Sequence, residues 1–290
     1  MRWPALAAIP LVGCASLIGA SFDDAHPAPT DAEVDVVDAH ETLPDVSIEV
    51  PPPFVPTSLP GLAFWIDATQ GVDVDGTNAV TVWHDLSANH YDAIPPNQAT
   101  RAPKLVAAAL GGKPVVHFTA ADPDLLQTSW SGPGVANLSI FVVVRGYATS
   151  ALRFQSTFGA IPYLIFPIDL AANAASPSFW LDVGDTQAHS ADLFTYFDGG
   201  ASVLETTWST TVAATAATFL DGKLIEQRIV DPALPPASTL FIGGSLPATG
   251  FQASFTDGDV AEAIVYTSAL DESARNAVEG YLLDKWAIAP

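Results

Sequence analysis

Residues 140–144 read Ile-Phe-Val-Val-Val, an apolar run without a polar position. A strand with one face in water alternates apolar and polar residues, whereas an unbroken apolar run predicts a strand covered on both faces. Residues 80–83, Val-Thr-Val-Trp, show the alternating pattern, and residues 219–225, Phe-Leu-Asp-Gly-Lys-Leu-Ile, place Asp-Gly between two apolar segments. Asp-Gly supplies the positive-φ pair that a two-residue hairpin requires. These stretches predict an antiparallel β-protein with a strand buried at its centre.

Short strand-like segments recur along the chain, bounded by Gly, Pro, Asn and Asp. We predict strands at residues 62–67, 80–85, 114–119, 138–146, 163–168, 178–183, 203–209, 216–220, 224–229, 239–242 and 260–266. Only the C-terminal segment has helical spacing, with Asp271 as its cap and an apolar face of Ala274, Val278, Tyr281, Leu282 and Trp286. The sequence therefore predicts one all-β domain over residues 58–290 with a short C-terminal helix.

The composition excludes several classes of partner and site. The chain of 290 residues carries 10 Lys and Arg against 32 Asp and Glu, a formal charge of −22. Such a protein lacks the cations that displace counterions from a phosphate backbone, so nucleic acid is excluded as a partner. One cysteine cannot form a disulfide framework or a cysteine-based zinc cluster. Hydrophobic residues make up 49% of the chain, enough for a large core.

The first residues are typical of an export signal. Arg2 supplies a positive charge, and residues 4–12 form an apolar run that is too short to span a membrane. Residues 11–14, Leu-Val-Gly-Cys, resemble the lipobox of bacterial lipoproteins. The resemblance implies a signal peptide of residues 1–13 and lipidation of Cys14, and Ala15 at the next position favours the outer membrane. The alternative is an ordinary signal peptide that happens to contain a cysteine.

Residues 14–57 are predicted to form a disordered tether. Residues 22–50 contain nine acids and no Lys or Arg, and five prolines follow in residues 51–60. Like charges extend such a segment, and prolines stiffen it. We expect the tether to hold the domain away from the membrane.

The domain resembles bacterial concanavalin A-like, laminin G-like (LamG) domains. The likeness begins with residues 61–68, Gly-Leu-Ala-Phe-Trp-Ile-Asp-Ala, and residues 80–89, Val-Thr-Val-Trp-His-Asp-Leu-Ser-Ala-Asn. It continues through Pro-Val-Val-His-Phe-Thr at 114–119, the hairpin at 219–223, and the ending from Ile-Gly-Gly at 242–244 to Trp286. It implies a jelly-roll β-sandwich of two antiparallel sheets. Ala88 and His90 depart from the pattern, which has glycines there, and residues 153–200 match no motif.

Laminarinase-type glycoside hydrolases share this fold, so the resemblance also raises catalysis. Those enzymes carry paired carboxylates in an E-x-D-x-E pattern on one strand, which this sequence lacks. The domain has few glutamates and scattered histidines, namely Glu205, Glu226, Glu262, Glu272, Glu279, His84, His90, His117 and His189. The sequence also has no G-x-S-x-G, no H-E-x-x-H and no phosphate-binding glycine loop. We therefore predict that the protein is not an enzyme, with a divergent glycoside hydrolase as the alternative.

Calcium is the cofactor that the resemblance implies. In related domains two of the matched motifs meet at a calcium site. When the ligands of that site are carried over position by position, the candidate ligands in this sequence are Asp85 and Asn89, with Asp259 or Glu262 as the partner. Calcium takes six to eight oxygen ligands, often gathered by loops. The alternative is that Asp85 and Glu262 accept hydrogen bonds from buried donors. Residues 71–76, where two aspartates alternate, are interpreted as a polar turn.

The tryptophans suggest where a ligand could bind. Trp130 and Trp180 have loose surroundings and are the candidates for stacking on a sugar ring, whereas Trp65, Trp83 and Trp286 are expected in the core. The leading hypothesis is a lipid-anchored bacterial surface protein, facing the periplasm or the cell exterior, whose laminin G-like domain binds a glycan or a surface protein. The alternative is a structural or adhesion module without a glycan ligand.

Overall fold

The computed structural model describes residues 53–96, 102–119, 124–130, 137–147, 152–156, 162–166, 178–183, 186–192, 200–209, 215–229, 237–244 and 257–289. The chain divides into two compact units, residues 1–50 and 51–290, and the described residues belong to the second. The predicted signal peptide, Cys14 and all of the tether before residue 53 lie outside the described residues.

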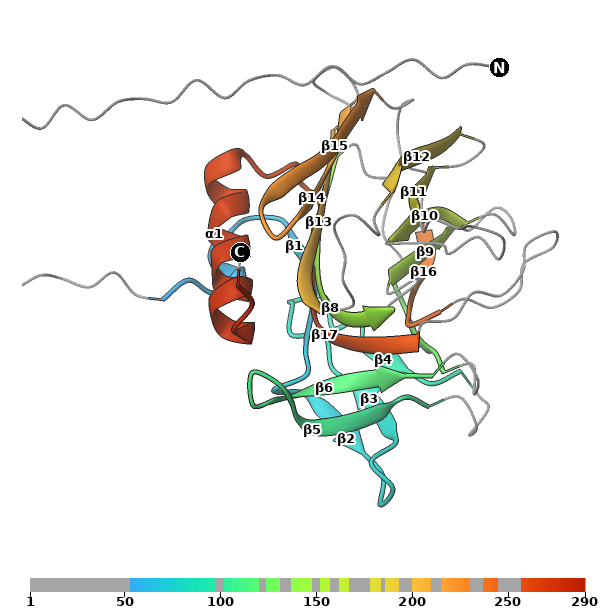
Figure 1. Ribbon diagram of the computed structural model, residues 1–290. Coiled ribbons are helices and arrows are strands. Elements are labelled where there is room, and N and C mark those ends of the chain that lie inside the picture. Colours follow the sequence, from blue (N-terminus) through green and yellow to red (C-terminus); the bar gives the residue numbers. More distant parts are fainter. Residues whose placement is uncertain are drawn as a thin grey trace, which may run out of the picture. The chain divides into compact units, whose positions relative to one another are not determined.

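The second unit is a sandwich of two antiparallel sheets (Figure 1). The eight-stranded sheet has the order β15-β14-β13-β8-β17-β6-β5, and β1 also pairs with β17. Its strands are β1 (Leu62–Asp67), β5 (Lys104–Leu110), β6 (Lys113–Phe118), β8 (Asn137–Tyr147), β13 (Ala201–Ser209), β14 (Thr215–Leu220), β15 (Lys223–Ile229) and β17 (Asp257–Tyr266).

The seven-stranded sheet has the order β10-β9-β16-β7-β4-β3-β2. Its strands are β2 (Val72–Val74), β3 (Val80–Trp83), β4 (Ala93–Ile94), β7 (Leu126–Thr128), β9 (Leu152–Ser156), β10 (Pro162–Phe166) and β16 (Ala237–Ile242). A further pair, β11 (Ser178–Val183) and β12 (Thr186–Asp192), forms a two-stranded sheet, and a 3-10 helix η1 (Pro56–Ser58) precedes β1. The predicted all-β sandwich is confirmed.

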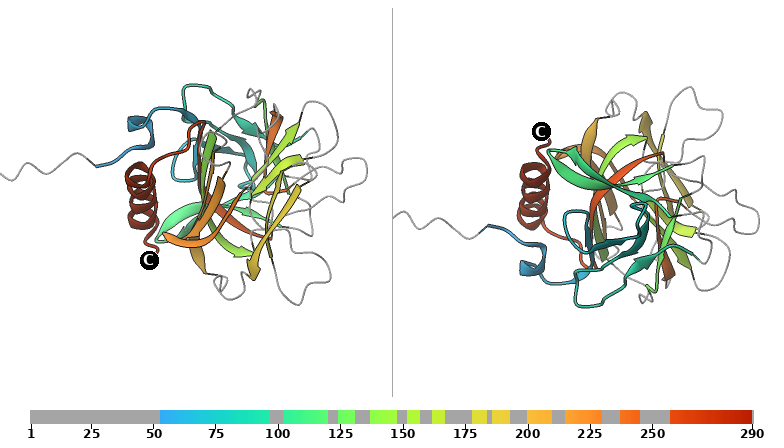
Figure 2. Two further views of the ribbon diagram at one scale, coloured as in Figure 1. Left: turned by 90° about the horizontal axis from the view of Figure 1, so that it is seen from above. Right: turned by 90° about the horizontal axis from the view of Figure 1, so that it is seen from below.

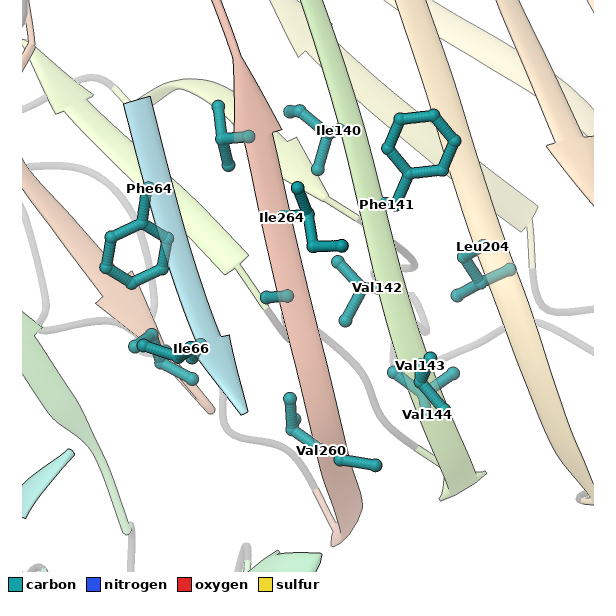
Figure 3. Close-up of a cluster of buried hydrophobic side chains, with 14 of the residues drawn as sticks. Phe64, Ile66, Ile140, Phe141, Val142, Val143, Val144, Leu204, Val260 and Ile264 are labelled. Carbon is teal, nitrogen blue, oxygen red and sulfur yellow. The ribbon is translucent and has the colours of Figure 1, made fainter. Parts of the chain in front are cut away.

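The central part of strand β8, residues 138–144, is buried, as the apolar run predicts. Residues 140–144 have no exposed surface, and their side chains lie among those of β1, β13 and β17 (Figure 3). The second sheet covers one face of this sheet. On the other face, Ser139 accepts a hydrogen bond from Leu270 N and donates one to Ser268 O, in the segment that leads to the C-terminal helix. An apolar run is needed here because neither face reaches water.

Helix α1 (Glu272–Trp286) lies against the outer face of the eight-stranded sheet, so it is on the outside of the sandwich (Figure 2). Asp271 caps it, accepting a hydrogen bond from Ala274 N at 2.8 Å, as predicted. Val278, Leu282 and Trp286 are buried on the predicted apolar face. None of the helices among the described residues has the length and hydropathy that crossing a bilayer requires.

The hairpin at residues 219–225 is also confirmed. It joins β14 to β15, and its two central residues, Asp221 and Gly222, have φ angles of 47° and 77°. These positive angles match the right-handed twist of the flanking strands. A Cβ atom at Gly222 would lie 2.6 Å from Glu279 Oε1, so the glycine also lets helix α1 approach the turn.

Candidate functional site

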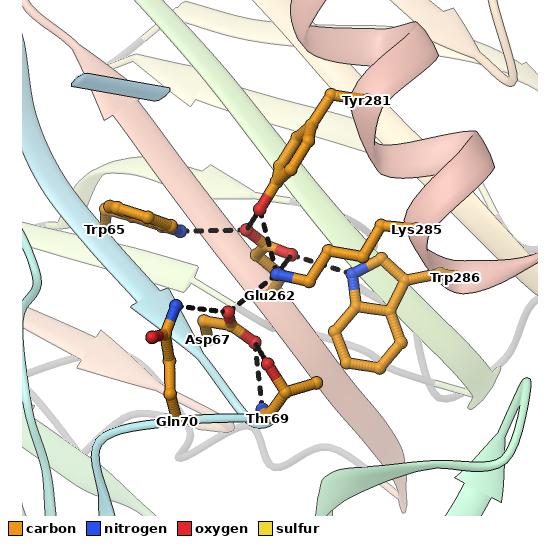
Figure 4. Close-up of polar contacts among 8 residues, drawn as sticks. All are labelled: Trp65, Asp67, Thr69, Gln70, Glu262, Tyr281, Lys285 and Trp286. Atoms are coloured by element: carbon orange, nitrogen blue, oxygen red, sulfur yellow. Dashed lines mark hydrogen bonds and ion pairs between the residues drawn. The ribbon is translucent and has the colours of Figure 1, made fainter. Parts of the chain in front are cut away.

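Glu262 lies on β17 in a buried polar cluster beneath helix α1 (Figure 4). Its Oε1 atom accepts hydrogen bonds from Trp65 Nε1 at 2.8 Å and Tyr281 OH at 2.9 Å. Its Oε2 atom accepts one from Trp286 Nε1 at 2.7 Å and forms an ion pair with Lys285 Nζ, also at 2.7 Å. A carboxylate has about four acceptor positions, and all four are taken here by protein donors.

Asp67 belongs to the same cluster. It is the register partner of Glu262 on the neighbouring strand β1, and its Oδ2 atom lies 2.6 Å from Lys285 Nζ. Thr69 and Gln70 donate its other hydrogen bonds. Burial raises the pKa of Glu262, Asp67 raises it further, and the ammonium group of Lys285 opposes both effects.

Asp85 organises the turn after β3. Its two oxygens accept hydrogen bonds from Trp65 N, Ser87 N, Ser87 Oγ and Tyr91 N, at 2.8–2.9 Å. Asn89 donates a hydrogen bond to Ala63 O at 2.8 Å and so fastens the turn to β1. His90, at a position where the resemblance implies glycine, has a left-handed backbone with a φ of 53°. The turn therefore forms with histidine at this position.

Asp259 forms a third group. Its carboxylate contacts His117 Nδ1 at 2.8 Å and Arg145 Nη2 at 2.6 Å. The four predicted calcium ligands are thus each bound to other protein groups, and the described residues contain no cluster of three His, Cys, Asp or Glu side chains that could hold a metal ion. Because Asp85 and Glu262 are saturated by protein donors, these residues do not fit a calcium ion.

Glu205 of β13 and Glu279 of helix α1 meet a single arginine of the same helix, a proximity that the sequence pattern does not indicate. Arg275 Nη1 lies 3.2 Å from Glu205 Oε2 and 3.5 Å from Glu279 Oε2, and its guanidinium group stacks on Phe219. The Oε1 atoms of both glutamates are buried without a hydrogen-bond partner. Burial raises the pKa of Glu205 to about 8, against the opposing effect of Arg275.

Trp130 requires a correction. Its side chain is 3% exposed and packs against Tyr91 at 5.3 Å and Phe64 at 6.4 Å between ring centroids. A buried ring cannot stack on a sugar, so Trp130 is a core residue. Trp180 lies on β11 opposite His189 of β12, but its side chain is outside the described residues. Trp83 and Trp286 are buried in the core, as expected, and Trp65 is partly buried against it.

An exposed group of side chains lies on the neighbouring strands β2, β3 and β4. His84 is 42% exposed, and its two ring nitrogens lie 3.0 Å from Asp92 Oδ2 and 3.1 Å from Asp73 Oδ2. The side chains of Asp73 and Asp92 are exposed by 65% and 38%. We call Asp73, His84 and Asp92 the β2–β4 patch.

The β2–β4 patch is held on rigid supports. Asp92 Oδ1 accepts a hydrogen bond from Asp85 N at 2.9 Å, so the turn that Asp85 organises also orients Asp92. Only a doubly protonated imidazole donates from both nitrogens, and the hydrogen bonds to Asp92 and Asp73 accordingly raise the pKa of His84. The sequence pattern does not reveal this pairing, because the partners of His84 are 8 and 11 residues away.

Solved structures share the fold of this domain. The botulinum neurotoxin DC binding domain, solved in complex with rat synaptotagmin II, matches with a TM-score of 0.51 and 12% identity over 77% of this chain and 52% of that chain. The structure called HCR/D-Sa-GBL1/C matches with a TM-score of 0.50 and 11% identity over the same shares. A mutant of Trypanosoma rangeli sialidase gives 0.49 at 14% identity, over 79% of this chain and 34% of that chain.

This chain spans about half the length of the first two of these chains. No protein-family model matches the sequence, and a search of curated proteins finds no match. Likeness at such low identity shows a concanavalin A-like β-sandwich, which is the fold that the sequence motifs imply.

Proposed function

We propose that the protein is a lipid-anchored bacterial surface protein whose β-sandwich domain binds a glycan or a protein without cleaving it. The fold supports a binding role, because the toxin domain of the same architecture was solved with a protein bound. Fold alone does not assign function, so the proposal depends on how the carboxylates are arranged.

The observation that carries the proposal is that the two carboxylate pairs beneath helix α1 are closed to a substrate. Asp67 and Glu262 share Lys285, and Glu205 and Glu279 share Arg275. All four carboxylates are buried between helix and sheet. A glycoside hydrolase needs its acid and its nucleophile or base on either side of a bound sugar, which these positions cannot receive.

We assign ligand contact to the β2–β4 patch. Sugar hydroxyls and polar protein groups are recognised by hydrogen-bonding side chains held on a rigid frame, and the patch presents three such side chains at the surface. His84 is the residue that joins its two carboxylates, so its removal breaks the arrangement without disturbing the core.

A glycan array and pull-down with the full chain in mild detergent tests this assignment. We expect His84→Ala to weaken binding of a captured ligand about tenfold, the loss of one well-placed contact. Gln227→Ala, at an exposed position of β15 on the other sheet, is the control and should leave binding unchanged. Equal binding by the two variants would remove the patch from the proposal.

Lipid anchoring at Cys14 is the second part of the proposal, and it rests on the lipobox-like residues 11–14. Two or more acyl chains give stable membrane attachment, whereas one chain gives only reversible binding. We expect Cys14→Ser to move the protein from the membrane fraction to the soluble fraction of its native cell, and mass spectrometry of the wild-type N-terminal peptide to show the acyl mass. An unmodified Cys14 in membrane-bound protein would contradict anchoring by lipid.

A further inference from the structure

Two carboxylates face each other across neighbouring strands beneath helix α1. Asp67 of β1 and Glu262 of β17 are register partners, and both are completely buried. Like charges at directly opposed positions of an antiparallel pair destabilise the sheet, and burial removes the water that would screen them. The sheet therefore requires a positive charge at this position.

Lys285 provides that charge from the last turn of helix α1. Its Nζ atom lies 2.6 Å from Asp67 Oδ2, 2.7 Å from Glu262 Oε2 and 2.9 Å from the Tyr281 hydroxyl oxygen. The three oxygens use all three donors of the ammonium group. Tyr281 is one helical turn earlier and donates its own hydrogen to Glu262, so it holds the cluster from the helix side.

The ammonium group of Lys285 is thus a cation held by two carboxylates and a hydroxyl, which are oxygen ligands of the kind that calcium takes. The sequence resemblance implies calcium near Glu262, yet the oxygens of that carboxylate are filled by a lysine and three neutral donors. The place beside Glu262 where a calcium ion would bind is thus already occupied by the ammonium group of Lys285.

We infer that Lys285 is a built-in cation that replaces a bound calcium ion, so that the domain folds and stays folded without metal. Helix α1 brings the counterion with it when it docks, which couples packing of the helix to neutralisation of Asp67 and Glu262. Truncating the Lys285 side chain to alanine opens a site for a small organic cation in the space of the missing atoms.

Thermal unfolding of the full chain in mild detergent tests the inference. The wild-type protein is expected to give the same Tm in 5 mM calcium chloride and in EDTA, while Lys285→Ala is expected to lower the Tm by roughly 10 °C. Propylammonium, which is the fragment that the substitution deletes, should restore part of the lost Tm. Propanol, which has the same size without the charge, should not.

Lys285→Met is the matched variant, because it keeps the length of the side chain, loses the charge and leaves no room for propylammonium. It should lose a similar amount of Tm and show no recovery. A rise of the wild-type Tm with calcium, or a fall with EDTA, overturns the inference and needs no variant that folds. Equal recovery of Lys285→Ala by propanol and propylammonium also overturns it, because the site would then respond to volume and not to charge.

Discussion

The wild-type domain is expected to lose stability as the pH rises from about 5 to 8, and Glu205→Gln is expected to remove much of that loss. Glu205 lies between Phe141 and Phe219 on the neighbouring strands of the sheet, and burial in this environment raises its pKa from the ordinary 4.5 to about 8. The folded state therefore holds a proton that the unfolded state releases near pH 4.5.

The direction of the effect follows from this difference. Below pH 4.5 both states are protonated, and the contribution of Glu205 to stability is fully present. Between pH 4.5 and 8 the unfolded state is ionised while the folded state is not, so the free energy of unfolding falls, by roughly 3 to 5 kcal/mol over the whole range. Arg275 and Glu279 face Glu205 from the helix, and Arg275 opposes the rise of its pKa while Glu279 adds to it.

Urea unfolding at pH 5, 6.5 and 8 measures this contribution. Glutamine has the shape of the protonated acid and no proton to lose, so Glu205→Gln should flatten the pH dependence. Glu272→Gln, at an exposed helix position, should leave the wild-type slope in place. If Glu205→Gln and the wild-type protein had parallel slopes, Glu205 would be ionised in the folded state and the interpretation of its burial would be wrong.

Gly243→Ala is expected to destabilise the domain by about 3 kcal/mol or more, since backbone strain and a steric clash add together. Gly243 follows β16 with a φ of 79°, and a Cβ atom placed on it would lie 1.9 Å from Cδ1 of Phe118. Phe118 is fully buried in β6 and cannot withdraw without disturbing the core between the sheets.

Gly112→Ala separates the two costs. Gly112 has nearly the same φ, 75°, but a Cβ atom there meets nothing within 4 Å. The control should therefore show strain alone, about 1 kcal/mol. Equal losses in the two variants, measured by urea unfolding, would show that the ring of Phe118 moves aside and that the packing of β16 on β6 is loose.

The sequence predicts those parts of the fold whose pattern is local. The apolar run of β8, the Asp-Gly hairpin and the capped helix α1 were predicted correctly, since each depends on residues a few positions apart. Strand β5 was missed because its three alanines have low β propensity and it is an exposed edge strand. Strand β2 was missed because the alternating aspartates Asp73 and Asp75 were interpreted as part of a polar turn.

The clusters under helix α1 could not be predicted in the same way. Glu262 was singled out from the sequence, but its cluster with Asp67 and Lys285 was not. Asp67 and Lys285 are 218 positions apart in the sequence and meet only in the folded domain. The exposure of Trp130 was predicted wrongly, because neighbouring glycines do not indicate whether a side chain faces the core or the solvent. His84 depends on Asp73 and Asp92, which reach it only after β2 and the chain entering β4 pair with β3.

Binding without turnover is the central claim, and one titration tests it most directly. A glycan captured by the wild-type protein is titrated by calorimetry, and the same sample is then assayed for new reducing ends over a day. The account predicts saturable binding with one site per chain and no release of reducing ends above that of the buffer. Release of reducing ends that follows the protein concentration would contradict it and make the domain an enzyme.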